Sequence, residues 1–469
     1  MNESSDRATP APGESEVNTS ARRTEWAERH HNDDTRHVLA EDARYFLHQS
    51  VSTPCLSTIA RADGAYIEDT QGKRYLDFHG NNVHHIGYGH PRLKEAIRRQ
   101  MDDLPFAPRR FACKPATELA RTLAERAPGN LSKVLFTTGG SAAIEVALKV
   151  ARAATGRHKT VSFWDAFHGA GFGAASISGE QMFRSHAIGP LLSGTQQVAP
   201  FACYRCPYGY PDDNGQPQLE LCKLTCANMV RYVLEKEGDV AAVIAEPARA
   251  VPYIPPRGFW NAVRDACNDY GALLIFDEIP TGLGKTGKFF ACEHDEVTPD
   301  ILVMGKALGG GIMPLAAVIT TPELDVGADY AFGHYTHEKN PVSAAAGLAT
   351  ISIIEDERLV ENAAELGEIA LNRLREMQAR YAVIGDVRGR GMLFGIELVI
   401  DPQTKQAAND LAEAVLYRCL DKGLSFKLSL GNTLTFTPPL ILTKAQLDFA
   451  LGVIEESLVE ECHLAGLSP

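Results

Sequence analysis

Two short apolar runs near the middle of the chain predict a pair of buried strands. Residues 272–276 are all apolar and are followed at once by Asp277, and the apolar residues 301–304 are followed by Gly305 and Lys306. Runs of this length are too short for buried helices and are typical of strands that are covered on both faces. Because ligands of open α/β sheets bind beyond the carboxyl ends of the strands, we expect Asp277 and Lys306 to border a ligand site.

Strand and helix patterns alternate over most of the chain, with further apolar runs at 134–136, 160–164, 241–245 and 315–319. This alternation predicts an α/β fold in which a mostly parallel sheet is flanked by helices, with a smaller α/β or α+β domain built from both chain ends. We expect an arm that is disordered or loosely attached (residues 1–35), the N-terminal part of the small domain (36–90), a large domain (91–345) and the C-terminal part of the small domain (346–469).

Length, charge and cysteine content limit the possible classes of protein. A chain of 469 residues exceeds one ordinary core, which agrees with two domains. The net charge of -13 disfavours nucleic acid and anionic membrane surfaces as partners. No run of about 18 apolar residues predicts a membrane span, and no apolar leader is visible. Ten cysteines are too sparse for a disulfide scaffold. We therefore expect a cytoplasmic protein that binds small molecules.

A stretch of small residues follows the strand predicted at 134–136. It runs from Thr137 to Ala142 and leads into a helix predicted from Ala143. Small residues at this place leave backbone N–H groups free at the positive end of the helix dipole. The stretch therefore indicates a phosphate-binding loop.

The order and spacing of these motifs resemble those of the class III aminotransferases, which are fold type I enzymes that use pyridoxal 5'-phosphate. The resemblance rests on Asp-Glu-Ile-x-x-Gly-x-Gly-x-Thr-Gly from Asp277, on Pro-Asp-Ile at 299–301, and on Gly-Lys-x-Leu-Gly-Gly from Gly305. It extends from about residue 40 to the C-terminus. It implies that Lys306 carries the cofactor covalently and that Asp277 pairs with the pyridine nitrogen, which keeps the ring able to accept electrons.

The same resemblance implies roles for residues in other segments. Gly140 and Ser141 match the family's phosphate loop, although Gly139 and Ala142 depart from it. The remaining matches place Phe167 on the face of the cofactor ring, His168 and Glu246 near the cofactor, and Thr336 against the cofactor phosphate of a neighbouring subunit. The last match implies a homodimer with shared active sites.

Departures from the family pattern bear on the reaction. Pro280 replaces a glutamine that touches the cofactor in many members, and Thr437 replaces an arginine that binds a substrate α-carboxylate. Residues 46–50, 77–84 and 334–341 are most similar to the branch that acts as (R)-1-hydroxy-2-aminoethylphosphonate ammonia-lyase. This similarity implies a lyase that eliminates ammonia from a small amino-alcohol phosphonate. A transaminase is the alternative, and a non-catalytic homologue is disfavoured because Lys306 and Asp277 are both present.

Two further groups of residues leave alternatives open. Cys203, Cys206, Cys222 and Cys226 form two closely spaced pairs that are compatible with a tetrahedral zinc site, or they are separate loop residues. Because fold type I enzymes need no metal, we expect none. Arg109 and Arg110, with the loop that contains His84 and His85, are candidates for binding a substrate anion.

Overall fold

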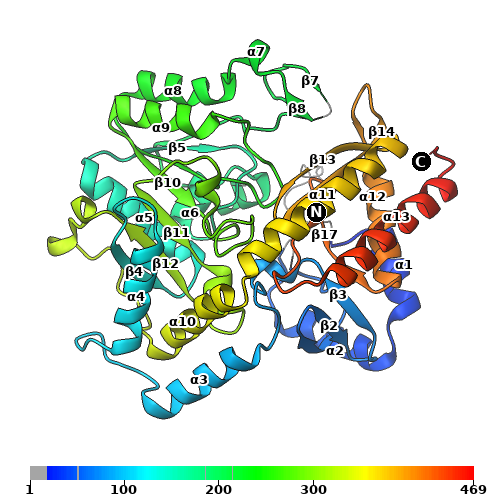
Figure 1. Cartoon of the computed structure of the whole chain (residues 1–469), viewed down its shortest axis with the longest axis horizontal. Coiled ribbons are helices and arrows are strands. Elements are labelled where there is room, and N and C mark those ends of the chain that lie inside the picture. Colours follow the sequence, from blue (N-terminus) through cyan, green and yellow to red (C-terminus); the bar gives the residue numbers. More distant parts are fainter. Residues whose placement is uncertain (1–17, 50–51, 185, 214, 469) are drawn as a thin grey trace, which may run out of the picture.

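A computed structural model of the chain describes residues 18–49, 52–184, 186–213 and 215–468 (Figure 1). The side chains of His186 and Asp213 are not included in this description. Residues 1–17, which make up the first half of the expected arm, lie outside the described residues.

The large domain is built on a seven-stranded sheet. All strands are parallel except β12, which runs antiparallel to both of its neighbours. The mostly parallel sheet expected from the apolar runs is therefore confirmed. In spatial order the strands are β4 (Lys133–Thr137), β12 (Ala316–Thr320), β11 (Ile301–Met304), β10 (Leu273–Asp277), β9 (Val240–Ala245), β5 (Lys159–Phe163) and β6 (Thr195–Val198).

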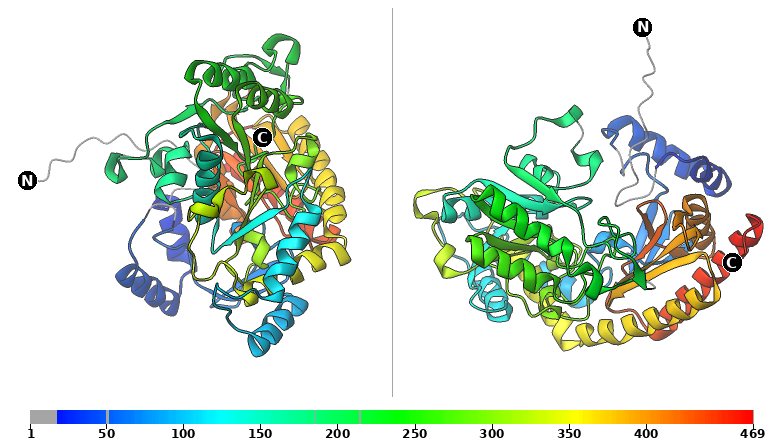
Figure 2. Two further views of the ribbon diagram at one scale, coloured as in Figure 1. Left: turned by 90° about the vertical axis from the view of Figure 1, so that its left-hand side faces the viewer. Right: turned by 90° about the horizontal axis from the view of Figure 1, so that it is seen from above.

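Helices cover both faces of this sheet. Alternate residues of each strand point to opposite sides, and both sets are apolar, so each face needs a covering layer. Ile275 packs into the cluster formed with α5, whereas Leu274 and Phe276 pack into the cluster that contains residues of α9. Figures 1 and 2 show these helices around the central strands. The helices of this part are α3 (Pro91–Asp103), α4 (Lys114–Arg126), α5 (Gly140–Thr155), α6 (Phe172–Ile177), α7 (Leu219–Cys222), α8 (Thr225–Glu237), α9 (Phe259–Tyr270) and α10 (Pro341–Asp356).

Both ends of the described chain contribute to the smaller sheets. A hairpin near the N-terminal end gains a fourth strand from far along the chain, because β16 (Leu424–Ser425) pairs in parallel with β3. The first sheet contains β1 (Ile59–Asp63), β2 (Tyr66–Asp69), β3 (Arg74–Asp77) and β16. The second contains β13 (Ile384–Arg390), β14 (Leu393–Asp401), β18 (Thr433–Phe436), β17 (Lys427–Ser429) and β15 (Gln406–Ala407). The accompanying helices are α11 (Leu359–Arg380), α12 (Asn409–Asp421) and α13 (Lys444–Leu464).

Two features differ from the expected division of the chain. Residues 21–30 of the expected arm form helix α1 (Ala21–His30), and α2 (Asp33–Tyr45) follows it. The indole of Trp26 is 1% exposed and donates a hydrogen bond of 2.8 Å to Asp421 Oδ1, so this part of the arm is attached. The expected boundary at residue 346 falls inside α10, which packs against α3 and α4 of the large domain.

The remaining elements are short. β7 (Asp212–Asp213) and β8 (Gln216–Pro217) form a two-stranded ribbon beside α7. Among the helices of the described ranges, none combines the length and apolar character that a membrane crossing would require.

Candidate active site

The strand pair β10 and β11 brings the two central site residues to one edge of the large sheet. The strands are parallel neighbours in which Asp277 lies opposite Val303, so Asp277 and Lys306 emerge at the same edge. Both residues line a cavity of about 190 Å³. Of the eight residues expected to touch the cofactor, the cavity walls include seven, namely Gly140, Ser141, Phe167, His168, Glu246, Asp277 and Lys306.

Asp277 is held in place by a histidine from a distant segment. The Nδ1 atom of His168 lies 2.8 Å from Oδ2 of Asp277, and each residue is 2% exposed. The other carboxylate oxygen accepts a hydrogen bond of 3.1 Å from the backbone N–H of Ile279. Nε2 of His168 is buried and has no partner among the described residues. The imidazole therefore fixes the direction in which the carboxylate faces the cavity.

The small-residue stretch forms the start of a helix. Helix α5 begins at Gly140, earlier than the sequence predicted, and its N-cap residue Gly139 provides no side-chain cap. A Cβ atom at Gly140 would lie 2.8 Å from Cδ1 of Ile279. The hydroxyl oxygen of Ser141 accepts a hydrogen bond of 3.0 Å from the backbone N–H of Ala170. Uncapped amides at the positive end of a 16-residue helix suit a phosphate group.

Phe167 and Glu246 complete the walls that the sequence predicted. The ring of Phe167 packs against Phe183 with a centroid distance of 4.5 Å. Glu246 is 5% exposed, and its Oε2 accepts a hydrogen bond of 3.1 Å from the N–H of Ala250. The aromatic ring offers an apolar surface for a flat cofactor ring.

Lys306 has an unusual backbone conformation. Its φ angle is +44°, in the left-handed region that non-glycine residues rarely adopt. It is the first residue of a 3₁₀ turn, Lys306–Gly309, whose other residues are buried, whereas Lys306 itself is half-buried. Such strained residues persist where the surrounding structure holds them, and they cluster at functional sites.

The segment that follows β3 lies beside this lysine. Gly80, Asn81 and Asn82 have positive φ angles of +45°, +47° and +60°, and their turn packs against the Lys306–Gly309 turn. A Cβ atom at Gly80 would lie 2.2 Å from Nδ1 of His84, so this position has no room for a side chain. The segment predicted as a ligand loop is therefore adjacent to the candidate site.

The two histidines proposed for anion binding are buried, and one ring nitrogen of each contacts the backbone. His84 and His85 are 0% and 1% exposed. Their Nε2 atoms donate to the carbonyl oxygens of Asp77 at 3.1 Å and Gly282 at 3.2 Å. Burial lowers the pKa of His84 to about 4. Both side chains therefore act as neutral structural groups.

Sequence reasoning missed a fully buried lysine near this site. Lys285 is 0% exposed, and its Nζ donates to the carbonyl oxygens of Pro438 at 2.8 Å and Thr437 at 3.3 Å. Burial lowers its pKa to about 7, and the nearby charge of Lys306 acts in the same direction. The motif that starts at Asp277 leaves this position unspecified, so nothing in the sequence indicated that Lys285 would be buried.

The structure places Thr336 and Arg109 outside the cavity of their own chain. Thr336 is exposed in a turn, so its contact with a neighbouring subunit stays a prediction. A guanidinium nitrogen of Arg109 lies 2.9 Å from Nδ1 of His334, and both side chains are at the surface. Within one chain, neither Thr336 nor Arg109 lines the cavity that contains Lys306.

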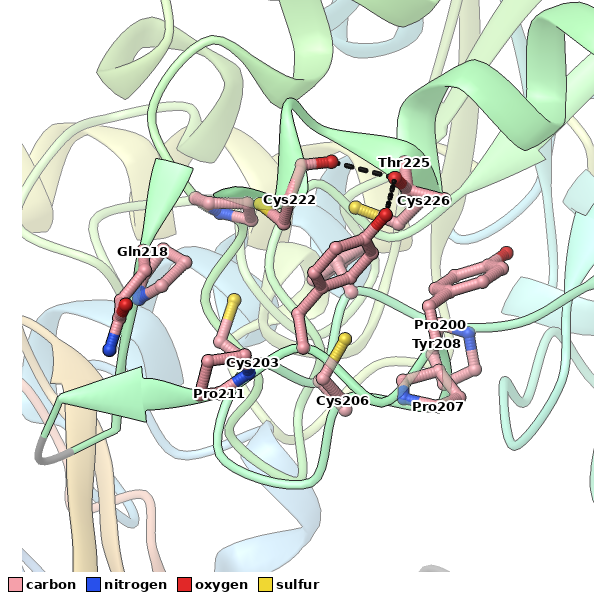
Figure 3. A pocket seen from close by; sticks show the side chains of 15 residues that line it. Pro200, Cys203, Cys206, Pro207, Tyr208, Pro211, Gln218, Cys222, Thr225 and Cys226 are labelled. Carbon is pink, nitrogen blue, oxygen red and sulfur yellow. Dashed lines mark hydrogen bonds between the residues drawn. The ribbon is translucent and has the colours of Figure 1, made fainter. Parts of the chain in front are cut away.

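The four cysteines of the insert line one small pocket (Figure 3). Thr225 Oγ1 closes one side of this pocket through hydrogen bonds with Tyr210 Oη at 3.1 Å and the carbonyl of Cys222 at 2.6 Å. Burial raises the pKa of Cys203 to about 12, and the other three thiols add to this effect. Within the described ranges, no group of three or more His, Cys, Asp or Glu side chains is arranged to hold a metal ion.

Comparisons with known proteins agree with this geometry. The family model described as aminotransferase class-III matches residues 48–458. The chain is 43% identical over 464 residues to an (R)-1-hydroxy-2-aminoethylphosphonate ammonia-lyase of Vibrio splendidus (strain 12B01). The matched region covers 97% of each chain. It is 34% identical over 432 residues to a leucine/methionine racemase of Thermococcus litoralis, which covers 90% of this chain and 95% of the relative.

A similar solved structure is an amine transaminase from an uncultivated Pseudomonas species in a form with bound pyridoxal phosphate. It has a TM-score of 0.82 and 30% sequence identity, and the match covers 89% of this chain and 98% of that one. The chain thus belongs to the class III aminotransferase family, with the fold type I architecture and pyridoxal 5'-phosphate as its cofactor.

The residues that line the cavity fit this cofactor. The uncapped first turn of α5 suits its phosphate, and the buried Asp277 carboxylate suits a protonated ring nitrogen. Lys306 also lines the cavity and provides an amine. Pro280 also lines the cavity, and its side chain has no donor or acceptor to replace the family's glutamine.

Proposed function

We propose that the protein is an ammonia-lyase that converts (R)-1-hydroxy-2-aminoethylphosphonate into phosphonoacetaldehyde and ammonia, a step in the degradation of phosphonates. The observation that carries this proposal is the 43% identity to the Vibrio splendidus protein of that activity over 97% of both chains. The identity to the racemase is lower, at 34%.

The environment of Thr437 supports a substrate without an α-carboxylate. Its hydroxyl lies within hydrogen-bond distance of two carbonyl oxygens to which it can donate, those of Phe78 at 3.2 Å and His79 at 3.1 Å. It is 1% exposed and carries no charge. The position of the family's carboxylate-binding arginine is therefore filled by a neutral residue that binds the backbone.

The proposed roles of the site residues follow from their positions. Lys306 would hold the cofactor through its amine, and the same amine would act as the base toward the substrate carbon that bears nitrogen. Asp277, which contacts His168 at 2.8 Å, would favour a proton on the ring nitrogen of the cofactor. Bound pyridoxal phosphate supplies the electron-withdrawing ring that no side chain provides.

The overall reaction is balanced without a second substrate. The hydroxyl on the neighbouring carbon leaves together with a proton as water, and one water molecule enters when the carbon–nitrogen bond is hydrolysed. One molecule of amino alcohol therefore gives one molecule of aldehyde and one of ammonia. No keto acid is consumed, in contrast to a transaminase.

The test is to incubate the cofactor-loaded protein with (R)-1-hydroxy-2-aminoethylphosphonate in the absence of any amino acceptor. We expect equal amounts of ammonia and phosphonoacetaldehyde over many turnovers. Lys306→Ala should abolish most of this activity, whereas Lys444→Ala, which changes an exposed lysine of α13, should not. Normal turnover by Lys306→Ala would contradict the role of the lysine.

A transaminase that passes an amino group from a primary amine to a keto acid is the second candidate. It is supported by the similarity to the solved amine transaminase, at 30% identity over 89% of the chain. In the same experiment a transaminase would stop after one turnover and resume when pyruvate or 2-oxoglutarate is added. That result would replace the lyase proposal.

A further inference from the structure

A second cavity, of about 560 Å³, lies apart from the one that contains Lys306. The two cavities have no lining residue in common. The walls of the second cavity are formed by the cysteine-containing insert, the segment that leads into α9 and residues 294–295 of the large domain, and by α11 and β13 of the small domain. A cavity of this size holds an ordinary small-molecule ligand, which would here contact both domains.

Arginine dominates the charged lining of this second cavity. Four arginines and two aspartates contribute to it. Both aspartates already bind an arginine, since Asp386 lies 2.7 Å from Arg388 and Asp295 lies 3.0 Å from Arg390. The two other arginines therefore leave an excess of positive charge on the lining.

The charged groups next to these walls do not cancel this excess. Glu397 contacts Arg388 at 2.7 Å, but it also pairs with Arg205. In the insert, Lys405 and Asp212 neutralise each other. The imidazole of His294, which also lines the cavity, adds no charge at neutral pH because burial and the charge of Arg390 lower its pKa.

The two arginines in excess, Arg257 and Arg375, have no acidic partner. Among the described residues, Arg257 has neither a hydrogen bond nor an ion pair, and Arg375 donates only to the side-chain oxygen of Asn372 at 3.2 Å. Both side chains are exposed, so a ligand can reach them from solvent. A single exposed arginine without a partner is ordinary. Two that line one cavity, from different domains, are able to bind the same anion.

A buried hydroxyl provides a second, independent observation. Tyr204 lines the same cavity and is 6% exposed. Its Oη is buried and has no hydrogen-bond partner among the described residues. A Cβ atom at Gly385 would lie 2.2 Å from this oxygen, which places the hydroxyl against β13. Because buried polar atoms normally have a partner, an unpartnered donor in the wall of a cavity indicates an acceptor supplied by a ligand.

We propose that this cavity binds a small phosphorylated anion through Arg257, Arg375 and the hydroxyl of Tyr204. All three groups can donate hydrogen bonds, and a phosphoryl group offers several acceptor oxygens together with negative charge. Guanidinium groups bind phosphoryl oxygens through two parallel hydrogen bonds. A ligand with two linked phosphoryl groups has the charge to engage both arginines. The site is separate from the chemistry at Lys306 and does not rest on the proposed function.

The test measures the binding of inorganic pyrophosphate to the cofactor-loaded protein by titration calorimetry at constant ionic strength. The cofactor fills the phosphate loop in this form, so that loop does not compete for the probe. We expect Arg257→Gln and Arg375→Gln each to weaken binding by about 10- to 100-fold, and Tyr204→Phe by about 2- to 10-fold. Arg373→Gln is the matched control, since Arg373 lies on the same helix as Arg375 and pairs with Glu455 at 2.6 Å.

A second measurement uses thermal unfolding of the same proteins. An anion that binds only the folded protein raises its midpoint of unfolding. We expect pyrophosphate to raise the midpoint for the unchanged protein and for Arg373→Gln, but not for the double variant Arg257→Gln/Arg375→Gln. Citrate, a carboxylate anion of similar charge, should give a smaller effect.

The outcomes are distinct and do not depend on turnover. A protein without lyase activity that binds pyrophosphate through Arg257 and Arg375 would leave the site standing while the proposed function fails. Absence of binding, or equal affinity in the unchanged protein and both arginine variants, would overturn the site. Equal weakening by Arg373→Gln would show a general effect of charge and would also overturn it. Citrate that binds as tightly as pyrophosphate would overturn the assignment to phosphorylated ligands.

Discussion

At the end of β10, two adjacent carboxylates have opposite environments. Asp277 faces the cavity and contacts His168, whereas Glu278 accepts hydrogen bonds from the backbone N–H groups of Ala291 at 2.6 Å and Cys292 at 2.8 Å. Successive residues of a strand point to opposite faces, which explains the difference. One carboxylate is available for chemistry, and the other anchors a neighbouring loop.

The first prediction concerns the Asp277–His168 pair. Asp277→Asn should keep the fold and lower kcat by at least about 100-fold, because a neutral amide no longer favours a proton on the cofactor ring. His168→Gln should lower kcat less, by about 10- to 100-fold, since it disturbs only the orientation of the carboxylate. Steady-state kinetics and the visible spectrum of the bound cofactor check both variants.

Asp265→Asn, an exposed aspartate of α9, is the control for this prediction. A kcat of Asp277→Asn within about twofold of the unchanged protein would refute the role, since tenfold corresponds to about 1.4 kcal/mol.

The sequence predicted some of these residues and missed others, and each outcome has a physical reason. Lys306 and Asp277 follow directly from apolar runs that end in a charged residue. The contact between His168 and Asp277 joins positions 109 residues apart, and it depends on the order of β10, β9 and β5 in the sheet. No local pattern encodes that order.

Among the helices and strands, apolar runs made six of the seven strands of the large sheet predictable, whereas the edge strand β6, which is polar and only partly buried, was not predicted. Helix α1 was not predicted, because its sequence is polar apart from a few residues and its attachment depends largely on Trp26. The start of α5 was placed too late, since glycine and serine are poor guides to a helix. In both cases tertiary contacts outweigh local preference.

The buried Lys285 links the glycine-rich loop after β10 to the segment after β18, and it predicts a pH dependence. Its pKa in the folded protein is about 7, against an ordinary value of 10.5, with burial as the largest cause. Between these values the unfolded chain binds a proton that the folded protein does not. The free energy of unfolding should therefore rise with pH across this window, by at most about 1.4 kcal/mol per pH unit from this group.

Lys285→Met should flatten the rise between pH 7 and 9, because it removes the titrating group while it keeps most of the apolar stem. Urea unfolding of both proteins at pH 7, 8 and 9 measures the difference. Lys422→Met is the control, since that lysine is paired at the surface. Parallel curves for Lys285→Met and the unchanged protein would contradict the assigned protonation state.

At the scale of the whole molecule, several apolar side chains of the N-terminal part remain uncovered in a single chain. Tyr45, Phe46 and Leu47 are 68%, 67% and 91% exposed. Contiguous apolar groups of this kind are commonly buried by a partner. Together with the exposed Thr336, they support the prediction of a homodimer.

We predict that sedimentation will show a dimer at assay concentrations, and that Thr336→Val will weaken retention of the cofactor by about 10-fold through loss of one hydrogen bond to phosphate. Thr404→Val, in an exposed turn of the small domain, should have no such effect. An active monomer would exclude shared active sites.

The pairing of β16 with β3 has a consequence for synthesis on the ribosome. Ser425 lies opposite Asp77, so roughly 350 further residues must be synthesised before the open edge of β3 can pair with β16. At about 5–20 residues per second this delay is roughly 20–70 s. During that interval β3 presents an open edge next to the segment that later packs against the Lys306–Gly309 turn, and a nascent chain in this state is a natural client for chaperones.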